Sequence, residues 1–207
     1  MCEGFLSEGF VYVRDFVPDV IEDMRYAGTD NFVGAKVDGY EKRRAILTRQ
    51  AALALRDMAD GLRMQGYRLM IFDAYRPRRA VAHFLRWAAD VDDVRMREKY
   101  YPEILDKADI LKKGFVAAKS SHSRGSTVDL TLTDAAGTPL NMGTGFDLFS
   151  PLAAHGAPGI AEEAAENRAL LCRQMIGAGI KPYNNEWWHY TLQNEPFPDQ
   201  DFDFAVR

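Results

Sequence analysis

The spacing of apolar residues in the first half of the chain predicts two helices around a buried strand. From about Arg44 to Gln65, apolar residues recur every three or four positions, which predicts an amphipathic helix that ends at Gly66. Residues 67–74 (YRLMIFDA) form an apolar run of strand length after that glycine and predict a buried strand. Pro77 suits the first turn of the second helix. The apolar faces of the two helices are expected to hold Ala51, Leu55, Met58, Ala59 and Leu62, and then Val81, Phe84, Leu85 and Ala88.

In the second half of the chain, the pattern of apolar residues predicts a strand, then a helix, then a last strand. Val128, Leu130 and Leu132 alternate with polar residues, which predicts a strand with one polar face. A helix is expected from about residue 159 to 178, capped by Gly179, and the aromatic run EWWHYTL is expected to be the last strand. The inward face of that helix is expected to hold Ala161, Ala165, Ala169, Cys172 and Ile176.

The order of these elements indicates an α+β fold. Residues 11–16 (VYVRDF) are expected to form a short strand, residues 29–42 a loop, and residues 89–115 short helical turns. Strands and helices do not alternate in regular βαβ units, and the chain contains no repeat or Ser/Gly linker. We therefore expect a single domain over residues 1–207, with a central antiparallel or mixed sheet flanked by helices.

Composition narrows the possible partners. The chain has 207 residues, of which 47% are hydrophobic and 27% charged, as in ordinary globular proteins. Its 26 Lys and Arg against 30 Asp and Glu give a net charge of −4, which argues against nucleic-acid binding. No apolar run approaches the ~18–20 residues of a membrane span, and the N-terminus has no signal-peptide pattern. Cys2 and Cys172 form no disulfide framework, and we expect Cys172 to be a buried, inert thiol. These features predict a cytoplasmic protein without a nucleic-acid or membrane partner.

Two of the four histidines lie in surroundings that suit chemistry. His122 lies in a Ser- and Gly-rich loop, and Asp129 begins the polar face of the strand that follows. The two side chains either converge on one ion or merely hydrogen-bond to each other. His83, off the apolar face of its helix, is expected to be a solvated surface residue, and His155 an ordinary loop residue.

His189 lies in EWWHY, three residues after Glu186. On an ideal strand this spacing puts the two side chains on opposite faces, so both can reach one site only if the strand is locally irregular. Two imidazoles and one carboxylate, with a fourth position open, are typical of catalytic zinc. Zinc lowers the pKa of its bound water and polarises a carbonyl. Glu186 is a candidate for the general base that such a site needs.

Arg76 follows the buried strand and directly precedes Pro77. Its guanidinium could hold a carboxylate or stabilise negative charge on a carbonyl oxygen. The alternative is an arginine that caps the helix or forms a structural salt bridge. Arg78 and Arg79 are expected to be surface charges.

The motifs YRP, SSHSRGSTVDLTL and EWWHY together resemble the zinc-dependent D-alanyl-D-alanine dipeptidases of the VanX type, within the D-Ala-D-Ala metallopeptidases. The resemblance extends to DNFVGAKVDGYE, YRPRRAVAHFLRWAA, YYPEI and NEPFPDQDFDF, so it covers nearly the whole chain from about residue 4. It implies the hedgehog/DD-peptidase-like fold. It also implies hydrolysis of the free dipeptide D-Ala-D-Ala to D-alanine.

The resemblance also implies a role for each site residue. His122, Asp129 and His189 would bind one Zn2+ per chain, with Glu186 as the general base and Arg76 stabilising the tetrahedral intermediate. The substrate would lie in a small pocket, with Tyr26 and Asp147 at its amino end, Ser120 and Ser121 lining it, and Phe84 and Trp188 as apolar walls.

Three interpretations of the function remain at this point. A D,D-carboxypeptidase or another small-dipeptide peptidase of the family differs from a D-Ala-D-Ala dipeptidase mainly at the substrate's amino end, where Asp147 would pair with an ammonium group. Without the resemblance, Asp147 would be taken as a loop cap. A non-catalytic zinc-binding module is disfavoured because it needs neither Glu186 nor Arg76. The family context is peptidoglycan metabolism, and the sequence leaves open glycopeptide antibiotic resistance or use of the dipeptide as a nutrient, the oligomeric state and the metal used in the cell.

Overall fold

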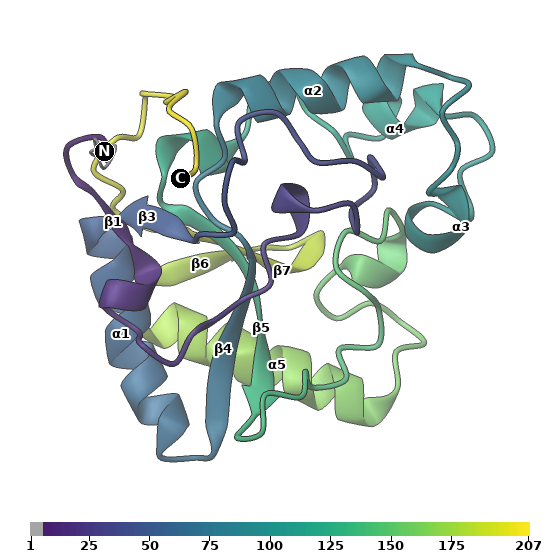
Figure 1. Cartoon of the computed structure of the whole chain (residues 1–207). Helices are drawn as coiled ribbons and strands as arrows, with labels where there is room; N and C mark the ends of the chain where they lie inside the picture. The colour runs from purple at the N-terminus through teal and green to yellow at the C-terminus, as the bar shows by residue number, and fades with distance from the viewer. Residues whose placement is uncertain (1–5) are drawn as a thin grey trace.

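A mixed five-stranded sheet forms the centre of the protein, as a computed structural model describes it for residues 6–207 (Figure 1). The strand order is β2-β4-β5-β7-β6; β2 is parallel to β4 and the other neighbours are antiparallel. A separate antiparallel pair, β1 and β3, lies beside it. The strands are β1 (Phe10–Tyr12), β2 (Ile21–Glu22), β3 (Ile46–Thr48), β4 (Tyr67–Asp73), β5 (Thr127–Asp134), β6 (Ile180–Tyr183) and β7 (Glu186–Leu192). The predicted α+β class with a mixed central sheet is confirmed.

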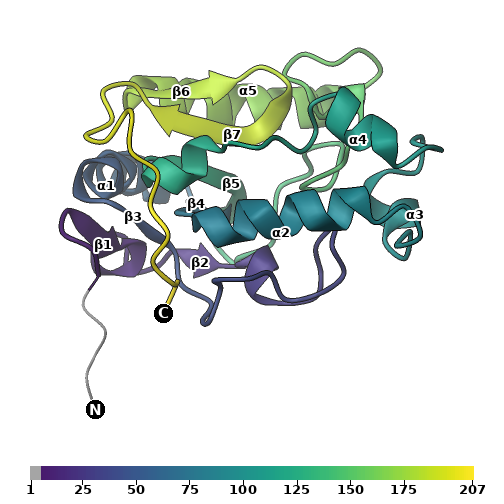
Figure 2. The same cartoon turned by 90° about the horizontal axis from the view of Figure 1, so that it is seen from above.

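The helices lie around this sheet in two groups. They are α1 (Arg49–Arg63), α2 (Arg78–Ala89), α3 (Arg97–Tyr100), α4 (Ala108–Lys112) and α5 (Glu162–Gly177). α1 and α5 contact each other and pack against β4 and β6. α2 lies apart from them, across the top of Figure 1, and the view from above shows it beside α4 and α3 (Figure 2). The sheet is therefore covered by elements from both halves of the chain.

One hydrophobic core joins these layers. Leu55 and Leu62 of α1 are fully buried, as are Leu130 and Leu132 of β5. Burying such side chains stabilises the fold by roughly 1.5–3 kcal/mol each before the loss of chain entropy is counted. The helical spacing of α1 and the alternation in β5 thus create the two apolar surfaces that the sequence predicts.

The predicted boundaries differ from the structure near the N-terminus. The first long helix begins at Arg49, whereas the spacing predicts Arg44, because residues 46–48 form β3 and pair with β1. The predicted strand over residues 11–16 is also shorter, since a 3-10 turn occupies Val13–Asp15. The short strands β2 and β6 have no clear signal in the sequence. Their positions depend on pairing with β4 and β7.

The predicted inward face of α5 is wrong. Its buried residues are Ala164, Arg168, Leu171 and Met175, whereas Ala165, Ala169 and Ile176 are exposed. Alanines on several faces give little contrast, and Arg168 is buried because its guanidinium donates to the carbonyl oxygens of Met142, Leu152 and Ala154. Cys172 is only half-buried, and this burial raises the pKa of its thiol. Cys2 lies outside the described residues.

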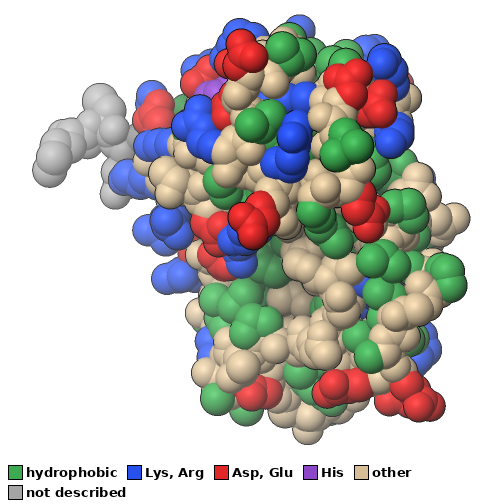
Figure 3. Space-filling view, turned by 90° about the vertical axis from the view of Figure 1, so that its right-hand side faces the viewer, with side chains coloured by type: hydrophobic (Ala, Val, Ile, Leu, Met, Phe, Trp, Pro, Cys, Tyr) green, Lys and Arg blue, Asp and Glu red, His purple; other side chains and the backbone are tan. Residues whose placement is uncertain are grey.

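The surface carries charges of both signs. On the face shown in Figure 3, acidic and basic side chains intermingle with hydrophobic ones. Among residues 6–207, no helix has the length and hydropathy needed to cross a membrane.

Gly125 offers a test of how closely the chain packs at the turn before β5. Its φ is +79°, and a Cβ at this position would collide with the ring of Phe10. We expect Gly125→Ala to lower the free energy of unfolding by about 1–2 kcal/mol for the left-handed backbone and about 1–3 kcal/mol more for overpacking. Gly66→Ala is the matched control, because Gly66 has φ +85° and a Cβ added there would meet nothing within 4 Å. Urea denaturation of both variants would show equal losses if the packing at Gly125 were unimportant.

Candidate metal centre

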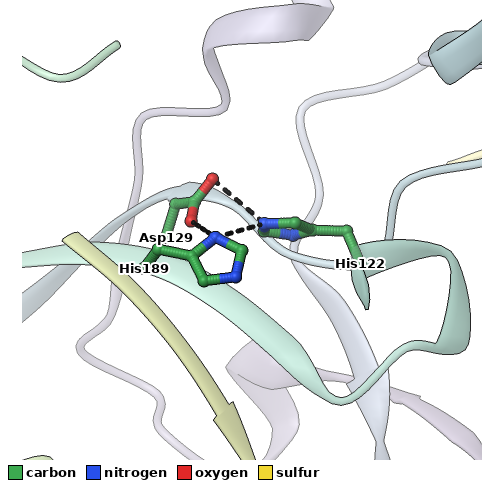
Figure 4. A group of neighbouring side chains, drawn as sticks. All are labelled: His122, Asp129 and His189. Atoms are coloured by element: carbon green, nitrogen blue, oxygen red, sulfur yellow. Dashed lines mark hydrogen bonds and ion pairs between the residues drawn. The ribbon is translucent and has the colours of Figure 1, made fainter. Parts of the chain in front are cut away.

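Two neighbouring strands and one turn bring a metal-binding set of side chains together. Asp129 of β5 is directly opposite His189 of β7 in the antiparallel register. His122 lies in a 3-10 turn, η3 (Ser121–Arg124), which leads into β5. Figure 4 shows the three side chains pointing toward one another. Residues far apart in the sequence thus meet because β5 pairs with β7.

The three side chains form a triangle in which each one contacts the other two, and Asp129 uses a different carboxylate oxygen for each imidazole. Nε2 of His122 is 3.2 Å from Oδ2 of Asp129, Nδ1 of His189 is 3.1 Å from Oδ1 of Asp129, and the two nitrogens are 3.3 Å apart. Ligands of tetrahedral zinc at bond lengths near 2.0–2.1 Å are about 3.3 Å from one another. Oδ1 of Asp129 is buried and accepts no well-aligned hydrogen bond within residues 6–207. The chemistry and spacing of the donors therefore fit zinc.

Neighbouring groups orient both imidazoles. Nδ1–H of His122 donates to the carbonyl oxygen of Ala74 at 2.7 Å, which leaves Nε2 with a free lone pair. Nε2 of His189 is 3.3 Å from Oγ of Ser121, on the ring edge away from Asp129. Such contacts fix the tautomer and the ring plane of a metal ligand.

Electrostatics favour the protonation states that a metal needs at Asp129 and His122, but not at His189. Burial acts to raise the pKa of Asp129, but the imidazoles of His122 and His189 outweigh it and hold this pKa below its usual value. Burial lowers the pKa of His122. The pKa of His189 is raised, because the interaction with Asp129 outweighs the opposing effect of burial. At neutral pH this set offers a carboxylate and at least one neutral imidazole.

Glu186 lies beside this triangle. The register of β6 and β7 shifts between Pro182 and Tyr183, so that Tyr183 pairs with Glu186 and residues 187–189 are extra on β7. This is the local irregularity that the spacing of Glu186 and His189 requires. Oε2 of Glu186 is 3.6 Å from Nδ1 of His189, and its side chain is 29% exposed. Burial raises the pKa of Glu186.

Arg76 is held by a carboxylate that sequence reasoning missed. Asp73, at the end of β4, is fully buried and accepts hydrogen bonds from Nε of Arg76 at 2.9 Å and from the hydroxyl of Tyr40 at 2.6 Å. Arg76 also lies 3.6 Å from Oδ2 of Asp129. Burial raises the pKa of Asp73. The only signal in the sequence was an acidic residue at the end of an apolar run, three positions before the arginine.

All eleven residues predicted to form the metal and substrate site line one cavity of about 270 Å³. They are Tyr26, Arg76, Phe84, Ser120, Ser121, His122, Asp129, Asp147, Glu186, Trp188 and His189. The cavity also has walls that the sequence did not indicate, formed by Phe32, Val81, Phe115, Phe149, Lys119 and Tyr183. Tyr183 packs edge-on against the ring of His189, with centroids 5.6 Å apart.

A second carboxylate, Asp147, belongs to the same cavity. Its Oδ2 accepts a hydrogen bond from the hydroxyl of Tyr26 at 2.7 Å. Asp147 is buried and has φ 60°, the one non-glycine residue with positive φ in the described part of the chain. Such strain is often found at functional sites. Burial raises the pKa of this carboxyl well above its usual value, and a cation bound beside it would lower that pKa again.

The other two histidines lie outside the cavity lining. His83 is half-buried, not solvated as predicted, because its Nδ1 accepts a hydrogen bond from the backbone N–H of Asp38. His155 lies in a loop, as expected, and packs edge-on against Tyr190. Burial lowers the pKa of His155.

This chain matches one family model and several known proteins. Residues 6–207 match the peptidase M15 family, described as D-ala-D-ala dipeptidase. The D-alanyl-D-alanine dipeptidase of Enterococcus faecalis is 46% identical over 97% of this chain and 100% of its own length. That of Enterococcus faecium is 43% identical over 96% and 98% of the two chains. That of Streptomyces coelicolor is 41% identical over 97% and 100%.

Metal binding can be tested through stability. Because Zn2+ would bind the folded state, we expect it to raise the melting temperature of the metal-free protein, with a stabilisation of about 2.7 kcal/mol at a hundred times the Kd. His189→Ala should abolish most of this gain because it removes one donor. His83→Ala, which changes a histidine outside the cavity, should keep it. Equal responses of both variants in differential scanning fluorimetry would place the metal elsewhere.

Proposed function

Because this chain belongs to the peptidase M15 family of D-Ala-D-Ala dipeptidases, it is a peptidase, and we propose that it hydrolyses the free dipeptide D-Ala-D-Ala to D-alanine with the help of one zinc ion. One observation carries this proposal. A triangle of zinc-type donors, an acid and a paired arginine line a cavity that also holds a buried carboxylate for an ammonium group.

His122, Asp129 and His189 would hold the metal. When bound, zinc polarises the carbonyl of the scissile bond and lowers the pKa of a water molecule. The remaining chemistry belongs to side chains of this protein.

Glu186 acts as the general base and then as the general acid. Its carboxylate takes a proton from the attacking water and passes it to the nitrogen of the leaving D-alanine as the C–N bond breaks. Its place beside His189, on the irregular segment of β7, supports this role.

Arg76 stabilises the negative charge that develops on the carbonyl oxygen. Its guanidinium stays charged at all relevant pH values, and Asp73 holds one edge of it through Nε. The other two nitrogens of the guanidinium, Nη1 and Nη2, lie near Ser120 and Asp129, which line the cavity. A donor fixed before the reaction needs little reorganisation during it.

Asp147 and Tyr26 would bind the amino end of the substrate. A buried carboxylate is much less costly when an ammonium pairs with it, so the binding of a free amine is favoured. Phe84 and Trp188 would enclose the methyl groups, while Ser120 and Ser121 would border the same space. This pairing favours a dipeptidase over the alternative, a D,D-carboxypeptidase or another small-dipeptide peptidase of the family. A non-catalytic zinc module has no use for the Glu186 and Arg76 arrangement.

We place this reaction in peptidoglycan metabolism, in the cytoplasm, where free D-Ala-D-Ala would be the substrate. The product would be two molecules of D-alanine. Both glycopeptide resistance and use of the dipeptide as a nutrient fit this chemistry.

Removing the base tests the mechanism. We expect Glu186→Gln to lower kcat for D-Ala-D-Ala by about 10²–10⁴-fold, because the amide cannot accept the proton. Zinc content should remain one per chain, since the three donors are intact. Glu162→Gln, on the exposed first turn of α5, is the control and should be as active as the unmodified protein. Full activity of Glu186→Gln in an assay of D-alanine release would rule out this role.

The amino end is tested with a blocked substrate. The unmodified protein should cleave D-Ala-D-Ala but not N-acetyl-D-Ala-D-Ala. Asp147→Asn should raise KM for the free dipeptide by about 10–100-fold, as expected for the loss of a hydrogen bond to a charged group. Asparagine tolerates positive φ, so the backbone is matched. Efficient cleavage of the acetylated peptide by the unmodified protein would instead indicate a carboxypeptidase.

A further inference from the structure

The C-terminal segment of the chain lies against both segments that carry the site. We define the C-terminal clamp as residues 195–204, which run beside β1 and β3 (Figures 1 and 2). We propose that this clamp is a positioning element: it ties the turn that carries His122 to the loop that carries Arg76. This inference rests on the proposed function only where activity is the readout.

A single clamp residue bridges the two segments through its backbone. The N–H of Phe202 donates to the carbonyl oxygen of Ser123 at 2.9 Å, and its own carbonyl oxygen accepts from the N–H of Arg78 at 3.1 Å. The segments also meet directly, since the N–H of Arg76 donates to the carbonyl oxygen of His122 at 3.2 Å. Phe202 thus adds two backbone hydrogen bonds to a contact that also includes the bond from the His122 imidazole to the carbonyl oxygen of Ala74.

On the side of the His122 turn, the clamp adds a two-pronged ion pair. Nε and Nη2 of Arg124 donate to the two carboxylate oxygens of Glu195, each at 2.8 Å. The side chains are only 24% and 12% exposed, so solvent screens this pair less than the surface pairs. Bidentate geometry of this kind fixes orientation as well as distance. Arg124 is two residues from His122.

On the side of the Arg76 loop, the contacts are aromatic and polar. The ring of Phe204 stacks on that of Tyr75, with centroids 4.1 Å apart, and the Tyr75 hydroxyl donates to the carbonyl oxygen of Phe204 at 3.0 Å. Asp203 accepts from the backbone N–H of Arg79 at 2.8 Å. The clamp therefore holds residues on both sides of Arg76.

The ring of Phe10 packs against both the clamp and the turn that carries His122. This ring contacts the clamp residues Phe197, Phe202 and Phe204, and it fills the space where a side chain at Gly125 would lie. The turn that carries His122 is thus packed between β1 and the clamp. A shift of the clamp would leave room for the turn to move.

The clamp contributes no side chain to the lining of the cavity, so its effect would pass through His122 and Arg76. Loss of outer partners typically costs 10–100-fold in metal affinity or activity. A misplacement of about 1 Å can cost as much as 10²-fold in rate.

Two point variants test the clamp in the full-length chain. Glu195→Gln weakens the pair with Arg124, and we expect it to weaken Zn2+ binding about 10-fold, measured by competition between the protein and a chromophoric chelator. Phe202→Pro removes the N–H that donates to Ser123, and it should weaken Zn2+ binding and also lower kcat at saturating zinc by about 10-fold or more.

Two control variants separate positioning from stability. Arg207→Ala breaks an exposed tail ion pair with Glu41 outside the clamp, and it should leave both readouts unchanged. Leu62→Ala destabilises the core at α1, and the folded fraction should keep its zinc affinity and kcat. Clamp variants that melt earlier yet bind zinc and turn over substrate like the unmodified protein would overturn the proposal.

The two proposals can fail separately. If Phe202→Pro does not fold, Glu195→Gln decides through zinc affinity. If the unmodified protein does not cleave D-Ala-D-Ala, the proposed function fails, and zinc affinity of the clamp variants still supports or overturns the clamp.

Discussion

The arrangement of the cavity depends on the register of three antiparallel strands. In β4, β5 and β7, the positions of Asp73, Asp129 and His189 lie side by side in one row across the sheet. A slip of one residue in β5 would turn Asp129 to the opposite face and remove it from His122 and His189. The buried alternation of β5 opposes such a slip, because it would also exchange the faces of Leu130 and Leu132 with those of Asp129 and Thr131, and all four side chains are buried.

This row of residues brings two carboxylates together in the protein interior. Asp73 and Asp129 are both almost completely buried, and Arg76 lies between them, 2.9 Å from one carboxylate and 3.6 Å from the other. Burying two anions is costly, and one guanidinium compensates only part of that cost. A divalent cation at His122, Asp129 and His189 would supply the missing positive charge. The same charge balance that holds Arg76 in place thus favours metal binding.

Local patterns in the sequence predicted the elements whose signal is short-range. The spacing in α1, the run of β4 and the alternation of β5 each indicate the correct element. The predicted buried face of α5 was wrong for two reasons. Alanines on several faces give little contrast in hydrophobicity, and Arg168 is buried because its guanidinium donates to distant carbonyl groups. The clamp could not be found in this way, since its partners are far apart in the chain. Asp73 is only three residues from Arg76, but its burial and its bond to Tyr40 depend on distant segments.

The site was predicted mainly from its motifs. Residue types alone left open whether His122 and Asp129 share an ion, and whether Glu186 and His189 reach the same space. The pairing of β5 with β7 and the irregular register of β7 answer these geometric questions, because all four residues border one cavity.

The most direct test of the proposed zinc mechanism is a titration of metal-free protein with Zn2+, followed by release of D-alanine from D-Ala-D-Ala. We expect no turnover without metal, a linear rise with added zinc and a break at one equivalent per chain. Turnover that is independent of zinc, or no turnover with one zinc bound, would contradict this mechanism.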